Sequence, residues 1–126
     1  MAKSVNRYFK LIHSRDIRPS TRVWCPAADI YRHKGGWIVK VDLAGVSPDE
    51  LEIAIKGRVL SIAGRRRDTL YGEGVDYHQL EITYSRFEKT LRFPCSIDGA
   101  AIRRDYKDGL LILYLESEEN CDEENA

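Results

Sequence analysis

The sequence has little sulfur, little proline and no excess of charge of either sign. Of its 126 residues, three are cysteine, one is methionine and four are proline, while 20 Lys and Arg balance 20 Asp and Glu. A neutral chain has no overall field that attracts a nucleic acid or an anionic membrane. Neither is therefore expected as a partner.

Long apolar runs are also missing. No stretch approaches the ~20 consecutive apolar residues that span a bilayer, and the first residues lack the apolar run of a signal peptide. We therefore expect a soluble cytoplasmic protein. A chain of 126 residues can bury one core, so it suits a single domain.

The three cysteines show no CxxC spacing, which argues against a disulfide framework and against a zinc site. Cys95 is expected in the core and Cys121 as a loose thiol of the tail. Cys25 lies near the expected start of the domain, where it is either a passive small residue or a redox-sensitive thiol that cross-links two subunits.

Motifs of catalysis are absent from the sequence. None of the three histidines is close in sequence to a second metal ligand or to a nucleophile, and Gly72-Glu73-Gly74 lacks the Lys-Ser/Thr of a phosphate-binding loop. The basic run Arg65-Arg66-Arg67 reads as a charged loop beside an apolar strand or as a phosphate contact. The sequence therefore predicts no enzyme, no catalytic residue, no metal and no cofactor.

Turn formers separate several short segments, in most of which apolar residues alternate with polar ones. These segments are residues 37–43, 51–55, 59–63, 78–84, 87–93, 102–106 and 110–115. A tight turn at Asp108-Gly109 joins the last two. The pattern predicts an all-β fold, an immunoglobulin-like antiparallel β-sandwich of about seven to nine strands, over residues 24–116.

Two terminal segments flank this domain. In the leader, residues 1–23, four apolar side chains share the spacing i, i+3, i+4 and i+7 of one helical face: Val5, Tyr8, Phe9 and Ile12. A short N-terminal amphipathic helix is expected, which either binds other proteins or packs on its own sandwich. The tail, residues 117–126, is acidic and is expected to be disordered and solvated.

The order of motifs resembles the α-crystallin domain of small heat-shock proteins over residues 24–116. Asp29-Ile30-Tyr31 and residues 43–46 resemble two of its elements, with Ala44 in place of a proline. Residues 60–65 resemble its Leu-x-Ile-x-Gly-x-Arg strand end, and residues 77–94 follow its Glu-x-x-Tyr-Gly-x-Phe-x-Arg stretch. Residues 102–111 resemble its Ala-x-x-x-Asn-Gly-Val-Leu signature. Three further positions depart from the family pattern: Ser85 for glycine, Lys89 for arginine and Arg104 for alanine.

The resemblance implies an ATP-independent holding chaperone that binds partly unfolded proteins. It also implies a strand-swapped homodimer, because bacterial and plant-type members have a long loop that pairs with the partner's first strand. The loop is residues 66–76 here and the receiving strand is residues 27–31. The expected interface residues are Ala27, Asp29, Tyr31, Leu70 and Tyr71. A flexible surface loop is the alternative.

Larger family assemblies form when an Ile-x-Ile-type tail motif docks in a groove of a neighbouring sandwich. The predicted groove lies between strand 51–55 and strands 102–115, lined by Leu51, Ile53, Ile55 and Ile102. Residues 116–126 contain no such motif, so we expect a dimer or small oligomer, able to join other small heat-shock subunits. The strand 110–115 is apolar on both faces, which predicts that Leu110, Ile112 and Tyr114 face a partner or client.

Two other classes of sandwich compete with this interpretation. A p23-like co-chaperone binds one folded partner with the same fold, but it lacks both the long loop and the Asp-Gly-Leu-Leu run. A glycan-binding sandwich presents exposed aromatic platforms, whereas Trp37 lies in a core-facing pattern.

Overall fold

The computed structural model describes residues 24–70 and 72–117. Within these residues there are seven strands and one short 3-10 helix, η1 (Pro48–Glu50). The strands are β1 (Ala28–His33), β2 (Gly36–Asp42), β3 (Glu52–Lys56), β4 (Val59–Arg65), β5 (Arg86–Arg92), β6 (Ala101–Lys107) and β7 (Leu110–Glu116). The predicted helical leader lies outside the described residues.

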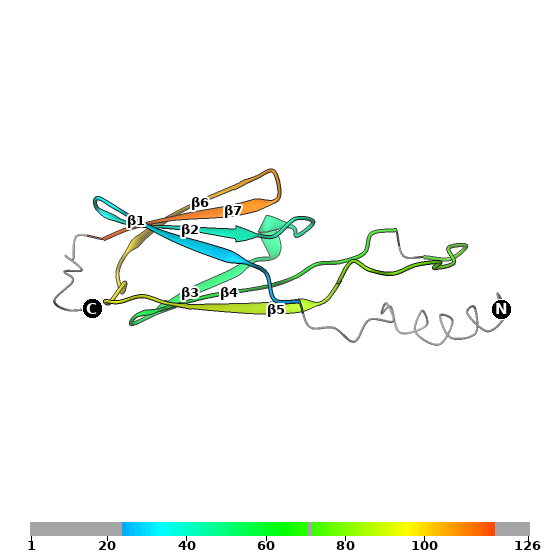
Figure 1. Ribbon diagram of the computed structural model, residues 1–126, viewed down its shortest axis with the longest axis horizontal. Helices are drawn as coiled ribbons and strands as arrows, with labels where there is room; N and C mark the ends of the chain where they lie inside the picture. Colours follow the sequence, from blue (N-terminus) through cyan, green and yellow to red (C-terminus); the bar gives the residue numbers. More distant parts are fainter. Residues whose placement is uncertain (1–23, 71, 118–126) are drawn as a thin grey trace.

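The strands form two antiparallel sheets that pack face to face (Figure 1). The first sheet has the order β1-β2-β7-β6, and the second has the order β3-β4-β5. Seven strands in two packed sheets confirm the predicted all-β sandwich. No helix of the described part is long and apolar enough to cross a membrane.

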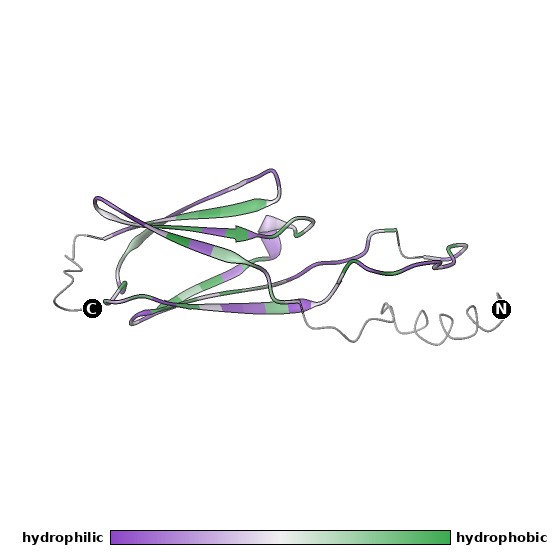
Figure 2. Cartoon of the chain, in the orientation of Figure 1, coloured by the Kyte–Doolittle hydropathy of each residue, from purple (hydrophilic) through white to green (hydrophobic). Residues whose placement is uncertain are grey.

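The core lies between the sheets, because every second residue of each central strand points inward. In Figure 2 green, the colour of apolar residues, covers most of β7 and parts of β2. Val39 and Val41 of β2 are fully buried, as are Leu111, Leu113 and Leu115 of β7. The other buried core side chains are Leu43, Val46, Leu51, Leu60, Ile62, Phe87, Phe93 and Ile97. The inward-pointing apolar side chains of both sheets thus fill the space between the two sheets.

Two aromatic contacts fix how the sheets are placed on each other. The Trp37 ring of β2 meets Phe93 edge to face at 5.3 Å, and Trp24, just before β1, meets Phe87 of β5 at 5.1 Å. The edge strand β5 therefore lies under β1 and β2. The opposite edge strand, β3, accordingly lies on the side of β6.

The predicted turn between the last two strands is confirmed. Asp108 and Gly109 adopt φ values of 54° and 80°, and Lys107 and Leu110 are paired on either side of them. Two successive positive φ values are typical of the two-residue hairpin turns that match strand twist. A side chain at residue 109 would also meet the Ala44 Cα at 3.1 Å. Glycine is therefore required at this position.

The predicted strand 78–84 is wrong. Between β4 and β5 the described residues form one isolated bridge, between Val46 and Arg66, and no strand. The two legs of this segment run outward from the end of the second sheet (Figure 1). A strand needs a hydrogen-bonded neighbour, so alternation alone does not make one where the chain leaves both sheets.

Candidate functional site

The strand β1 is an open edge of the first sheet, because it pairs with β2 alone. Asp42 N donates to Ala27 O at 2.9 Å, which makes residues 27 and 42 a hydrogen-bonded pair. Such pairs alternate along an antiparallel ladder, so the backbone groups of Ala28, Ile30 and Arg32 point away from β2. Backbone groups that face outward from a sheet edge can receive another strand.

The side chains of β1 are mostly exposed, including the predicted interface residues. Ile30 is 38% and Tyr31 43% exposed. The Tyr31 hydroxyl donates to Asp29 Oδ2 at 3.4 Å, and Lys40 Nζ lies 5.4 Å from the Tyr31 ring centroid. Ala27 lies one residue before the strand and is exposed. The edge is thus accessible and exposes the large side chains of Ile30 and Tyr31.

The segment from residue 66 to residue 85, called the projecting loop below, carries further exposed apolar side chains. Leu70 is 79% exposed, Ile82 57% and Val75 44%. Tyr71, its predicted partner in the interface, lies outside the described residues. The sequence pattern did not identify Ile82 and Val75 as exposed residues. Periodicity shows which side chains share a face, but it does not show whether that face is exposed to solvent. Large apolar side chains left this open are typical of an interaction surface.

The outer face of the first sheet is the second apolar surface. Leu110, Ile112 and Tyr114 of β7 are half-buried there, whereas the residues between them are buried in the core. Ile38 of β2 is opposite Tyr114 in register and extends the surface, a contribution that the sequence pattern did not indicate. Arg103 Cζ lies 3.9 Å from the Tyr114 ring centroid. Apolar residues on both faces of β7 thus divide into a core set and a solvent-side set.

The residues of the predicted groove lie in three different environments. Ile53 and Ile55 of β3 are half-buried against the core, and Ile102 of β6 is 39% exposed. Leu51 belongs to the core itself at 7% exposure. Its Cδ2 would lie 3.0 Å from a Cβ at Gly64. Because β3 and β6 lie on the same side of the sandwich, the three isoleucines line neighbouring sheet edges.

The predicted leader contacts Val5, Tyr8, Phe9 and Ile12 lie outside the described residues. So does Cys121. Cys25 is an exposed free thiol, whereas Cys95 is half-buried and disulfide-bonded. The odd number of cysteines therefore did not exclude a bridge, and the expectation of Cys95 as a plain core residue is wrong.

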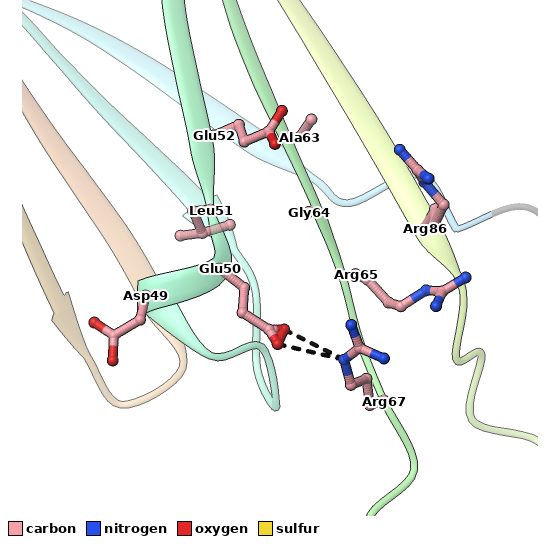
Figure 3. Close-up of a pocket in the computed structure, with 9 residues that line it drawn as sticks. All are labelled: Asp49, Glu50, Leu51, Glu52, Ala63, Gly64, Arg65, Arg67 and Arg86. Carbon is pink, nitrogen blue, oxygen red and sulfur yellow. Dashed lines mark hydrogen bonds and ion pairs between the residues drawn. The ribbon is translucent and has the colours of Figure 1, made fainter.

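One open pocket of about 430 Å³ lies at the end of the second sheet (Figure 3). It is lined by charged groups of both signs, among them Asp49, Glu52 and Arg86. Arg67 Nε lies 3.3 Å from Glu50 Oε2, with both side chains well exposed, so this ion pair contributes about 0–1 kcal/mol. The pocket contains no histidine, cysteine or hydroxyl group, and no group of metal ligands exists within the described ranges.

Comparison with known proteins assigns the fold to a family. Residues 29–126 match the Hsp20/alpha crystallin family. The chain is 33% identical over 91 residues to a 19.0 kDa class II heat shock protein of Oryza sativa, covering 68% of this chain and 52% of that protein. It is 29% identical over 98 residues to spore protein SP21 of Stigmatella aurantiaca, covering 78% and 58%. The chain thus spans about three fifths of the length of such relatives.

Solved structures show the same fold. Heat shock protein 16.0 from Schizosaccharomyces pombe superposes with a TM-score of 0.68 at 23% identity, over 76% of this chain and 89% of that one. A small heat-shock protein from Xylella fastidiosa gives 0.64 at 22% identity, over 79% and 91%. With its sandwich, its open first strand and its projecting loop, this chain belongs to the Hsp20/alpha-crystallin family.

Proposed function

We propose that this protein is an ATP-independent holding chaperone, which binds partly unfolded proteins and prevents their aggregation. The family supports a chaperone role and not an enzymatic one. The observation that carries the proposal is the set of large apolar side chains left exposed by a complete sandwich, above all Leu70 and Ile82. The core of the sandwich is complete without these side chains. Large apolar side chains that stay exposed on a folded domain are typical of a surface that binds other proteins.

Holding works by mass action. A protein that binds unfolded chains lowers their free concentration, and no step of this process requires nucleotide hydrolysis. Each apolar side chain that becomes fully buried contributes about 1.5–3 kcal/mol. One such contact is weak, so the projecting loop and the outer face around Ile112 and Tyr114 would act together. The leader residues Val5, Tyr8, Phe9 and Ile12 are proposed as additional client contacts.

The proposed assembly is a reciprocal homodimer in which the projecting loop of each subunit adds a strand to β1 of the other. Two features support it: the backbone groups of Ile30 on β1 point away from β2, and the loop runs beyond the sandwich and forms no strand within its described residues (Figure 1). The donated strand is expected within residues 66–76.

A client assay tests the holding function. A heat-sensitive protein is warmed with an equimolar amount of this chain, with and without ATP, and light scattering is followed. The proposal predicts suppressed scattering that is the same in both conditions. A matched inert β-sandwich protein serves as the control. Scattering as high as with that control contradicts holding, and suppression that requires ATP contradicts the proposed mechanism.

Replacing residues 67–76 by a short Gly-Ser linker tests the dimer. The expected mass in solution falls from twice 14.5 kDa for the unaltered protein to the mass of a single variant chain, because the strand donor is gone. Circular dichroism of the same variant should still report the sandwich, since the core lies elsewhere. A variant that stays dimeric contradicts the swap.

The p23-like adaptor has less support than the holding chaperone. The long loop and the family match over residues 29–126 both favour the small heat-shock class. An adaptor would bind one folded partner and leave aggregation of an unrelated client unchanged, so the client assay separates the two.

A further inference from the structure

Three consecutive arginines, Arg65 to Arg67, lie where β4 ends and the projecting loop begins, and the middle one differs from its neighbours. Arg65 and Arg67 are exposed, whereas Arg66 is half-buried. Arg67 makes the weak pair with Glu50, and Arg65 lines the open pocket (Figure 3). Arg65 and Arg67 therefore serve as controls for the role of Arg66, because they are the same residue type at neighbouring positions.

The Arg66 guanidinium is held on several sides. Its Cζ lies 3.8 Å from the Trp24 ring centroid and 5.6 Å from that of Tyr84. Its Nε and Nη2 donate to Thr83 O at 2.9 and 2.6 Å, and its Nη1 donates to Ala44 O at 3.1 Å. Hydrogen bonds from a charged donor in a partly buried site are stronger than neutral ones.

The backbone of Arg66 adds to this contact. Its N–H donates to Ser85 O at 3.1 Å, which joins the outgoing and returning legs of the projecting loop. A Cβ at Gly45 would lie 3.2 Å from Arg66 Cδ, and Gly45 has a φ of +84°. Glycine at that position therefore leaves room for the arginine side chain and allows the backbone turn beside it.

The contacts of Arg66 connect the two elements that the proposed dimer uses. Thr83 and Tyr84 lie on the returning leg of the loop that carries the strand donor, while Trp24 lies four residues before the start of β1, which is the receiver. We propose that Arg66 is a positioning residue that sets the donor loop and the receiving edge of one subunit relative to each other. This inference rests on the proposed dimer.

Lysine cannot replace this side chain in full. A guanidinium is a planar fork that can donate twice to one carbonyl while its face stacks on an indole. An ammonium keeps the charge but has no plane to stack on Trp24 and no fork for Thr83 O. The contact therefore depends on geometry more than on charge.

The test compares dimer dissociation in four variants: R66K, R66A, R65A and R67A. Dilution followed by light scattering gives each dissociation constant, and thermal unfolding shows whether the sandwich is intact. Both Arg66 variants should weaken the dimer at least about tenfold, from the loss of stacking and of charged hydrogen bonds. The R65A and R67A variants should stay within about twofold. If R66A does not fold, R66K carries the test.

Coupling to Trp24 gives a readout that general destabilisation would not produce. Trp24→Leu should weaken the dimer, and its combination with R66A should cost less than the two single effects together, since both remove one contact. Additive effects overturn the inference, as do Arg66 variants that dissociate like the unaltered protein. An unaltered protein that is monomeric at every concentration overturns the proposed dimer and this inference together, whereas a dimer insensitive to Arg66 overturns the inference alone.

Discussion

The two edges of the first sheet, β1 and β6, are equally open but differently protected. Lys107 and Leu110 form a hydrogen-bonded pair next to the two-residue turn, so the backbone groups of Ile102, Arg104 and Tyr106 point away from β7. The residue at the centre of the outward-facing set is Arg104 on β6 and Ile30 on β1. A charge at the middle of an edge discourages strand addition, and an isoleucine does not.

The other residues of the two strands differ in the same way, with more charged side chains on β6 than on β1. The seven residues of β6 include four charged ones, Arg103, Arg104, Asp105 and Lys107. The six residues of β1 carry a charged side chain only at Asp29 and Arg32, and Arg32 stacks over Trp37 at 5.4 Å. One sheet thus has an edge suited to pairing and an edge that resists it, which predicts where a second subunit adds.

The largest expected effect comes from blocking β1. Ile30→Pro removes an outward N–H without breaking a bond to β2, because proline is tolerated where the N–H faces solvent. We expect the dimer to weaken more than about a hundredfold, from a lost hydrogen bond and a ring in the path of the incoming strand. The mass in solution, measured over a series of dilutions, gives the dissociation constant of the dimer.

The matched control is Ile102→Pro on β6. Ile102 is 39% exposed, nearly the same as Ile30, and its N–H also points outward. This variant should dimerise like the unaltered protein. Equal weakening by both prolines contradicts the division between the edges.

A smaller effect is expected when the charge of β6 is transferred to β1. Ile30→Arg keeps the backbone donor but places a cation at the centre of the receiving edge. We expect about tenfold weaker dimers, since an incoming apolar strand would leave the charge poorly solvated. Raising the salt concentration should not restore the dimer, because the penalty is desolvation rather than long-range repulsion.

The reciprocal change removes protection from β6. Arg104→Ile leaves an apolar or aromatic side chain at all three β6 positions whose backbone groups point away from β7. We expect self-association on heating to be about fivefold faster, measured by light scattering without a client, because an open apolar edge templates strand addition. The thermal unfolding midpoint should change little, since Arg104 is exposed.

The smallest expected effect concerns the outer face between the two edges. Ile112→Ser should reduce client holding about two- to threefold, because it removes one of several weak apolar contacts. Dimer dissociation should be unchanged, since Ile112 lies on a central strand away from β1 and the loop. A loss of dimer in this variant would show that the outer face belongs to the subunit interface.

The sequence pattern was sufficient to predict the sandwich fold, but it did not predict which side chains lie on the exposed surfaces. The inward positions of β2 and β7 follow from period-two alternation, and the Asp108-Gly109 turn follows from backbone preference, so both were predictable locally. Residues 78–84 have the same alternation yet form no strand, because pairing depends on a neighbour that is distant in sequence.

The contacts of Arg66 show the same limit. The sequence gives three equivalent arginines, and only the fold brings Trp24, Ala44 and Thr83 to the middle one. Likewise the alternation of residues 51–55 could not show that Leu51 would be buried beside Gly64 while Ile53 and Ile55 remained half-buried. Burial depends on neighbours that are distant in sequence, which no local pattern encodes.

Residue-resolved hydrogen exchange tests most directly whether β1 receives a second subunit. Amide exchange is measured by NMR at high and low protein concentration, on either side of dimer dissociation. The amides of Ala28 and Ile30 should be protected only at high concentration, while those of Ile102, Arg104 and Tyr106 exchange rapidly at both. Protection of the β6 amides, or β1 amides that exchange equally at both concentrations, would contradict it.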